Sequence, residues 1–221
     1  MMTRRLEHKG FTVVEVLIFS VVSLMFITLL SQVFIMASRR TEDSRLSVDI
    51  QQSAVMILKI FERDLNKTSA KAMASVDDSA AYILALTRVQ GWNNNNEVNW
   101  RKEQIIYGFD KADKSLYRGY YSQESDATPK TSPKYSDELL DSRPYLPTDP
   151  ELLGVFNSNT GKIRKLSPYV EEFWISDRKG QKTLFQSQPL MLRLKVRRPL
   201  STSERFAEFT IDRFYTLRNS F

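Results

Sequence analysis

The chain has 221 residues, no cysteine, one histidine and a formal net charge of +6. The lack of cysteine excludes disulfides, thiolate nucleophiles and cysteine-based zinc sites. A positive charge this mild suits a solvated surface better than a dedicated nucleic-acid-binding protein, so we do not expect nucleic acid to be a partner.

The first predicted element is a long apolar helix. Val16 to Ala37 is a run of 22 residues without a charge. As a helix it would be roughly 33 Å long at about 1.5 Å per residue, enough to cross the hydrocarbon core of a bilayer. The polar side chains in the run can hydrogen-bond to the backbone or to neighbouring helices, and they are Ser20, Ser23, Thr28, Ser31 and Gln32.

A cleaved secretory signal peptide is the alternative to a membrane span. Its apolar core would be about 7–15 residues long and would end in small residues. The run observed here is longer, and Ile35 occupies the position where a small residue would be needed before Ala37. The sequence therefore favours a single membrane-spanning helix.

The residues before the span carry a second pattern. Basic residues lead to Gly10, which is followed by Phe11, two apolar residues and Glu15; the basic residues are Arg4, Arg5 and Lys9. This pattern resembles the leader of type IV pilin-like proteins. The resemblance implies that a prepilin peptidase cleaves between Gly10 and Phe11 and N-methylates Phe11. It also implies that Glu15 pairs with the N-terminal amine of a neighbouring subunit during assembly.

Physical chemistry supports each part of this pattern. Gly10 has no side chain, so an extended backbone can enter a tight protease cleft. The leader cations favour the cytoplasmic side of the membrane, which would place the C-terminal domain in the periplasm of a bacterium. Glu15 lies at the edge of the hydrocarbon, where an ionised carboxylate needs a partner. The alternative for Glu15 is an interfacial charge that reaches the lipid headgroups.

The helix is predicted to continue beyond the membrane. Apolar residues recur every three or four positions, the pattern of an amphipathic helix, at Leu46, Ile50, Ala54, Ile57, Leu58, Phe61 and Leu65. No proline or glycine interrupts residues 11–90, so one helix should run from Phe11 to about Lys67. A coiled-coil seam is the alternative explanation of the stripe. We expect a leader at 1–10, a transmembrane half at 11–38, an amphipathic periplasmic half at 39–70 and a β-rich domain at 71–221.

The remaining sequence alternates between apolar and polar residues, which predicts strands. The expected strands are Tyr82–Val89, Gln104–Phe109, Ser115–Tyr121, Val170–Ser176, Leu190–Arg197 and Ala207–Leu217. Asp110–Lys114 and Asp177–Gly180 should form hairpin connections, and Asn93–Asn96 a polar loop. Six of the eight prolines fall between Thr128 and Pro168, which predicts a long irregular segment. The expected fold class is α+β, a long helix packed on an antiparallel sheet, which is the pilin fold.

Three downstream stretches resemble the J-type minor pseudopilins of type II secretion systems, namely Phe61–Asn66, Tyr169–Asp177 and Gln188–Leu190. The resemblance implies a structural subunit at the pseudopilus tip, with the I-type and K-type minor pseudopilins and the major pseudopilin as partners. Such a subunit initiates assembly and supports protein export from the bacterial inner membrane. A minor pilin of a type IV pilus or of a competence (DNA-uptake) pseudopilus remains the alternative.

The sequence offers few residues for catalysis. Removal of the leader would remove His8, leaving neither histidine nor cysteine for a catalytic dyad or a metal site. We therefore expect no enzyme activity and no cofactor. Four basic residues close to one strand could contact phosphates, although the solvated face of an edge strand is the favoured interpretation; they are Arg193, Lys195, Arg197 and Arg198.

Overall fold

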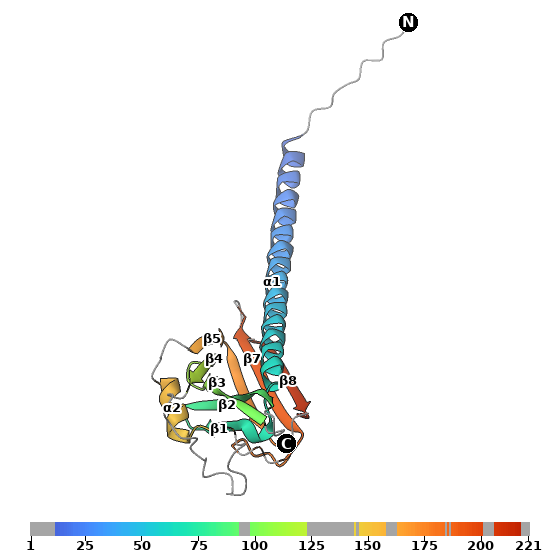
Figure 1. The fold of residues 1–221 in the computed structure, drawn as a ribbon. Coiled ribbons are helices and arrows are strands. Elements are labelled where there is room, and N and C mark those ends of the chain that lie inside the picture. The colour runs from blue at the N-terminus through green and yellow to red at the C-terminus, as the bar shows by residue number, and fades with distance from the viewer. Residues whose placement is uncertain are drawn as a thin grey trace. The chain divides into compact units, whose positions relative to one another are not determined.

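The computed structural model describes residues 12–92, 98–122, 144, 146–157, 163–183, 185, 187–200 and 206–217 (Figure 1). The chain divides into two compact units, Met1–Arg45 and Leu46–Phe221. A single helix, α1 (Val13–Leu65), begins in the first unit and ends in the second. The predicted polar loop Asn93–Asn96 lies outside the described residues.

The first unit consists of the N-terminal part of α1. Its side chains from Val13 to Met36 are exposed. The prediction of one unbroken helix is confirmed, since α1 ends at Leu65, two residues before the expected position. The absence of proline and glycine leaves every backbone N–H after the first turn able to join the helical ladder.

In the second unit the C-terminal part of α1 supplies one wall of the core. Its buried residues are Ile50, Ala54, Ile57, Leu58, Phe61, Asp64 and Leu65. The predicted apolar stripe is therefore confirmed as a packing surface, with Asp64 as an acidic member that the pattern did not include. A short 3₁₀ helix, η1 (Ala70–Ala72), leads from the helix to the first strand, and the Ser69 hydroxyl caps it by accepting the Lys71 N–H.

Two antiparallel sheets complete the second unit. The first has the order β1-β2-β3-β4-β5, with strands β1 (Met73–Asp77), β2 (Ala81–Trp92), β3 (Val98–Asp110), β4 (Ser115–Ser122) and β5 (Ile163–Ser167). The second has the order β6-β7-β8, with strands β6 (Val170–Ser176), β7 (Leu190–Pro199) and β8 (Phe206–Tyr215). The chain is thus an α+β protein with a long apolar N-terminal helix and antiparallel sheets.

All six predicted strands are present, but the expectation of an irregular segment between Thr128 and Pro168 was wrong in two places. Helix α2 (Asp149–Asn157) and strand β5 both lie within it. Pro150 is tolerated because it stands in the first turn of α2, where its missing N–H would have no helical partner. At its start the Thr148 carbonyl accepts the Leu152 N–H at 3.0 Å, and Glu151 Oε2 accepts the Thr148 N–H at 2.8 Å and the Thr148 hydroxyl at 2.9 Å.

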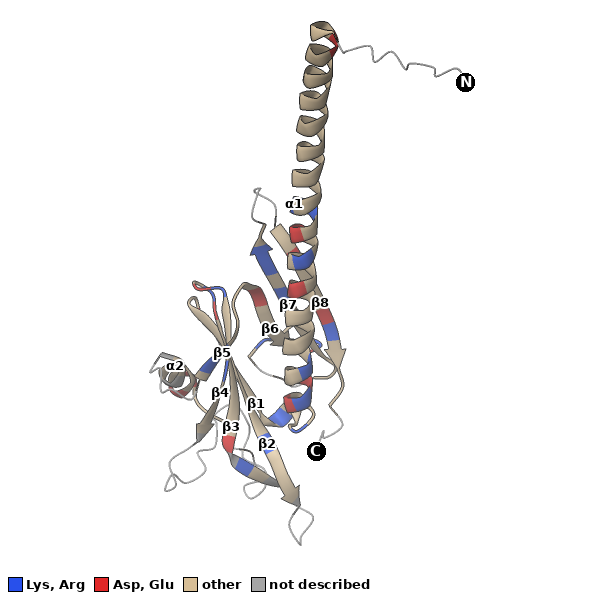
Figure 2. Ribbon diagram, turned by 90° about the horizontal axis from the view of Figure 1, so that it is seen from above, with Lys and Arg blue, Asp and Glu red and all other residues tan. Residues whose placement is uncertain are grey.

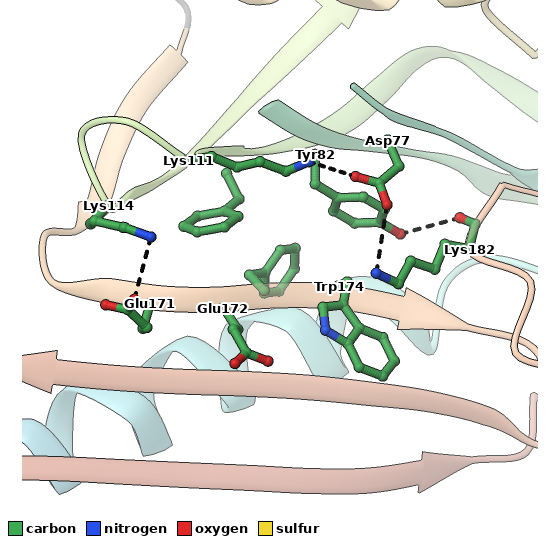
Figure 3. Close-up of a pocket in the computed structure, with 10 residues that line it drawn as sticks. Asp77, Tyr82, Lys111, Lys114, Glu171, Glu172, Trp174 and Lys182 are labelled. Carbon is green, nitrogen blue, oxygen red and sulfur yellow. Dashed lines mark hydrogen bonds and ion pairs between the residues drawn. The ribbon is translucent and has the colours of Figure 1, made fainter. Parts of the chain in front are cut away.

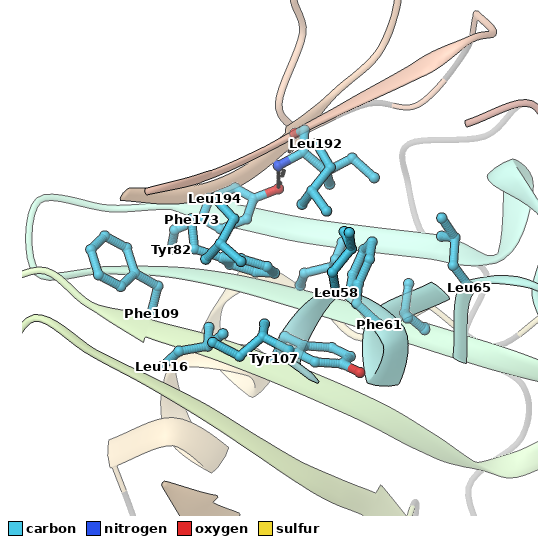
Figure 4. Packing of buried hydrophobic residues seen from close by; sticks show 14 of the residues in the cluster. Leu58, Phe61, Leu65, Tyr82, Tyr107, Phe109, Leu116, Phe173, Leu192 and Leu194 are labelled. Carbon is cyan, nitrogen blue, oxygen red and sulfur yellow. Dashed lines mark hydrogen bonds between the residues drawn. The ribbon is translucent and has the colours of Figure 1, made fainter. Parts of the chain in front are cut away.

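The main core fills the space between α1, one face of the first sheet and the inner face of the second (Figure 4). Phe61 lies at its centre and is fully buried. Its ring meets those of Tyr107, Phe173 and Tyr215 edge-on, at centroid distances of 5.2, 5.8 and 6.4 Å. The strict alternation of β7 places Leu190, Leu192, Leu194 and Val196 in this core.

A smaller core covers the opposite face of the first sheet. It is formed by residues of β1, β2 and β3 together with Leu152 of α2 and Leu146, which precedes α2. Phe156 of α2 packs against Tyr117, with ring centroids 5.7 Å apart. Gly108 is needed beneath it, because a Cβ at that position would lie 2.3 Å from Phe156 Cε2.

The two predicted turns are present. The Asp110 carboxylate accepts the N–H groups of Ala112 and Asp113 at 2.8 and 3.0 Å, and Lys114 takes a positive φ of 50° before β4 begins. The second turn ends at Gly180, with a φ of 78°. It begins the longer connection from β6, which ends at Ser176, to β7, which begins at Leu190, so the expectation that Asp177–Gly180 is itself the hairpin connection was wrong.

Candidate functional site

The N-terminal end of α1 is held by a reciprocal cap. Glu15 Oε2 accepts the Thr12 N–H at 2.9 Å and the Thr12 hydroxyl at 3.0 Å. In return, the Glu15 N–H donates to Thr12 Oγ1 at 3.3 Å. This is a capping box, in which two side chains satisfy N–H groups at the start of a helix. Gly10 and Phe11 lie outside the described residues, so the expected cleavage and methylation site is not part of the observed geometry.

The apolar half of α1 has the properties that a membrane-spanning helix requires. Within the described residues, α1 is the one helix long and apolar enough to cross a membrane, judged by length and composition. Three of its hydroxyl groups are satisfied within the helix: Ser20 donates to the Leu17 carbonyl, Thr28 to that of Leu24 and Ser31 to that of Ile27, each at 2.8 Å. Polar groups in hydrocarbon need such partners.

Apolar residues also remain exposed on the part of α1 that belongs to the second unit. Val48, Val55 and Met56 are exposed there, by 48%, 40% and 61%. They lie on the side of the helix away from the buried stripe. In the second unit α1 thus has one apolar side that packs on the sheets and, on its uncovered side, three apolar residues among polar ones such as Gln52 and Lys59.

The last turns of α1 are bonded to both sheets through two acidic residues. Asp64 Oδ2 accepts the Tyr107 hydroxyl at 2.7 Å and Arg118 Nε at 2.8 Å, both in the first sheet. Glu62 Oε1 accepts Arg213 Nη1 at 2.7 Å and the Tyr215 hydroxyl at 3.0 Å, both in the second sheet. The stretch Phe61–Asn66 therefore joins the helix to each sheet.

Asp64 is an unusual member of this group because it is only 3% exposed. It also lies near the C-terminus of α1, where the helix dipole disfavours a negative charge. The Arg118 guanidinium compensates this charge from a side chain that is itself mostly buried. Burial, and then the bond to Asp64, raise the pKa of Tyr107, so its hydroxyl stays protonated and remains a donor.

A cavity of about 330 Å³ lies where one end of the first sheet meets β6 (Figure 3). Aromatic rings and charged side chains line it: Asp77, Tyr82, Phe109, Lys111, Lys114, Glu171, Glu172, Phe173, Trp174 and Lys182. The Tyr82 hydroxyl donates to the Ile175 carbonyl at 3.1 Å. Burial raises the pKa of Tyr82, so this hydroxyl is neutral and serves as a donor.

The three lysines of the cavity are all in ion pairs. Lys111 Nζ lies 2.8 Å and Lys182 Nζ 3.6 Å from the Asp77 carboxylate, and Lys114 Nζ lies 3.3 Å from Glu171. The Lys114 pair joins the first sheet to β6 and the Lys182 pair joins it to the connection after β6, whereas Lys111 and Asp77 both lie at the end of the first sheet. The arrangement holds the two sheets together at this end, and it presents no free amine as a base. No group of three or more histidine, aspartate or glutamate side chains that could hold a metal occurs among the described residues.

The basic residues of β7 also have partners. Arg193 Nε and Nη2 each donate to the Asp212 carboxylate at 2.8 Å, and Lys195 Nζ lies 3.1 Å from Glu208. The guanidinium of Arg197 stacks over the Phe206 ring at 3.8 Å, and that of Arg198 over Tyr169 at 5.2 Å. The expectation of an edge strand was wrong, because β8 pairs with the outer side of β7 and makes it the middle strand.

No protein-family model, no curated protein and no solved structure matches this chain. The candidate sites therefore stand on their own chemistry. Of the residues that sequence reasoning singled out, Glu15 lies at the start of α1, far along the chain from the cavity and from the Asp64 network. Neither of those two sites was predicted.

Proposed function

We propose that the chain is a minor pseudopilin with the pilin fold, a structural subunit at the tip of a type II secretion pseudopilus. There it joins the I-type and K-type minor pseudopilins and the major pseudopilin, initiates assembly and supports protein export. The observation that carries the proposal is α1 itself. One unbroken helix has a first half that is apolar on every side and a last part that forms the core of an antiparallel β domain.

The proposed membrane topology rests on the leader cations Arg4, Arg5 and Lys9, with Arg39 and Arg40 at the other end of the run offset by Glu42 and Asp43. The leader cations stay in the cytoplasm, the helix crosses the inner membrane once, and the β-rich domain is periplasmic. Prepilin peptidase then cleaves after Gly10 and methylates Phe11. The exposed residues Val48, Val55 and Met56 are suited to pack against helices of neighbouring subunits, because they are apolar side chains that the domain itself leaves uncovered.

A structural role is favoured over a catalytic one by the charges in the domain. Each lysine of the cavity is already in an ion pair, as described above. The paired state of Arg193 and Lys195 likewise gives no support to a DNA-uptake subunit, which would need cations free to contact phosphates.

The charge of Glu15 provides the test of this function. We expect Glu15→Gln to reduce incorporation into the filament by about tenfold or more, the scale expected when one partner of a desolvated charge pair is lost. Glutamine keeps an oxygen that can accept the Thr12 N–H, so the capping box survives while the charge is removed. The measurement is the amount of the subunit in sheared filaments relative to the membrane fraction, at native expression.

Thr12→Val is the matched control. It removes the hydroxyl that caps the Glu15 N–H and keeps the carboxylate. We expect this variant to assemble normally if the carboxylate acts through its charge. Assembly of Glu15→Gln at the level of the natural chain would refute the charge-pair role, and a defect in Thr12→Val alone would assign the Thr12–Glu15 pair to helix capping.

A further inference from the structure

Strand β8 is a long strand at the margin of the second sheet. It has ten residues, Phe206–Tyr215, and within the described parts of the chain it pairs with β7 alone. Figures 1 and 2 both show it at the outer side of this sheet. A long uncovered edge is a template for pairing with another strand, and proteins usually protect such edges.

The hydrogen bonds of β6 determine which backbone groups of β8 face outward. The N–H and the carbonyl of Ile175 both bond to the Tyr82 hydroxyl, on the side away from β7. Ile175 therefore does not exchange backbone bonds with its partner Leu192. Because the pattern alternates, Leu192 bonds instead to Arg213 on β8.

The same alternation extends along the rest of β8. Ile211 and Phe209 bond inward to β7, so the N–H and carbonyl groups of Glu208, Thr210 and Asp212 face the open edge. An independent bond agrees with this assignment. The Arg197 N–H donates to the Tyr169 carbonyl at 2.8 Å, away from its partner Glu208 on β8.

The side chains along this edge are on the outer face of the sheet. Glu208, Thr210 and Asp212 are exposed, and two aromatic residues flank them, Phe206 at 47% and Phe214 at 67% exposure. An added strand would thus find backbone donors and acceptors in the middle of β8 and an apolar residue at each end.

Charges on the outer face alternate in sign from strand to strand. Arg193 and Lys195 of β7 pair with Asp212 and Glu208 of β8, and Glu172 of β6 lies on the other side of Lys195. Cross-strand neighbours of opposite charge stabilise a sheet and like charges destabilise it. The next strand in this series should therefore be basic.

A second copy of the chain does not fit this requirement. If two β8 strands paired antiparallel about Thr210, Glu208 of each copy would lie opposite Asp212 of the other, because the two residues are equally far from the centre. The like charges would oppose the pairing.

We propose that β8 accepts an extended strand from a different protein, antiparallel and basic, with lysine or arginine at two positions four residues apart that lie opposite Asp212 and Glu208. Main-chain bonds to Glu208, Thr210 and Asp212 supply the affinity, and the two cations supply the specificity. Strand addition at β8 concerns the globular domain alone and holds whichever assembly the chain joins.

A synthetic peptide provides the probe. It has nine residues, with lysine at the third and seventh positions, valine at the even positions and threonine elsewhere. Its control carries glutamate in place of both lysines. The full chain in detergent micelles should bind the fluorescent lysine peptide about tenfold or more tightly than the glutamate peptide. Amide hydrogen exchange at Glu208, Thr210 and Asp212 should slow when the lysine peptide is bound.

Thr210→Pro separates main-chain pairing from general attraction between charges. It removes an N–H that faces the open edge and spares the bonds to β7. We expect it to weaken binding of the lysine peptide by about tenfold or more, while Thr210→Val, which keeps the N–H, binds like the natural chain. Equal binding of the two peptides, no binding of either, self-association through β8, or unchanged exchange at the three amides would each overturn the proposal.

Discussion

Replacing Phe61 with alanine should lower the free energy of unfolding of the globular unit by about 3–5 kcal/mol, the usual cost of truncating a buried aromatic residue. Phe61 is fully buried and contacts rings from β3, β6 and β8. Its loss would open a cavity where the helix meets both sheets, and the surrounding strands could not close on it without shifting. Urea denaturation of the chain in detergent, followed by tryptophan fluorescence, measures the change.

Met56→Ala is the control on the same helix. Met56 is 61% exposed, so its truncation should change the free energy of unfolding by no more than about 0.5 kcal/mol. A similar loss in both variants would contradict the assignment of Phe61 to the core and of Met56 to an uncovered side of α1.

Replacing Asp64 with alanine should have an effect of similar size, about 3–5 kcal/mol. The variant leaves Arg118 mostly buried without its partner and removes the acceptor of the Tyr107 hydroxyl. An unpaired buried charge costs more than the pair contributes. The same urea titration measures this loss.

The second substitution Arg118→Met tests whether the loss of stability in Asp64→Ala arises from the unpaired, buried guanidinium of Arg118. In the Asp64→Ala background it should recover part of the lost stability, because no buried charge then remains unpaired. Additive losses in the double variant would show that the two residues act independently, contrary to the bond of 2.8 Å between them.

The helix α1 and most strands were predictable because apolar side chains recur every three or four residues in an amphipathic helix and every second residue in a strand. Spacing of three or four residues predicted α1 and its buried stripe, and strict alternation predicted β7 with its leucines inward. Strand β1 (Met73–Asp77) was missed because four of its five residues are buried, which leaves no alternation to detect.

Helix α2 was missed because the prolines before it and in its first turn outweighed a shorter motif. Thr148 and Glu151 are three residues apart, as are Thr12 and Glu15, and in both pairs the glutamate carboxylate accepts the N–H and the hydroxyl of the threonine. The spacing of threonine and glutamate could therefore have predicted where α2 begins and the role of Thr12 beside Glu15.

The Asp64 network and the cavity depend on contacts that a sequence pattern does not contain. Asp64 meets Tyr107 and Arg118 at separations of 43 and 54 residues along the chain. The position of β8 at the edge of its sheet likewise depends on strand pairing, which the sequence pattern does not contain. An edge strand and a middle strand can show the same alternation of apolar and polar residues. The sequence of β7 therefore does not distinguish the two, and β7 is a middle strand because β8 pairs with it.

The mature N-terminus tests the pilin-like assignment most directly. The chain, expressed with a prepilin peptidase and extracted from membranes, should begin at Phe11 and carry one N-methyl group when its intact mass is measured. Gly10→Val should remain uncleaved, because a branched side chain would enter the protease cleft in place of none. An N-terminus near Ser38, or an uncleaved natural chain in the presence of active peptidase, would contradict the assignment.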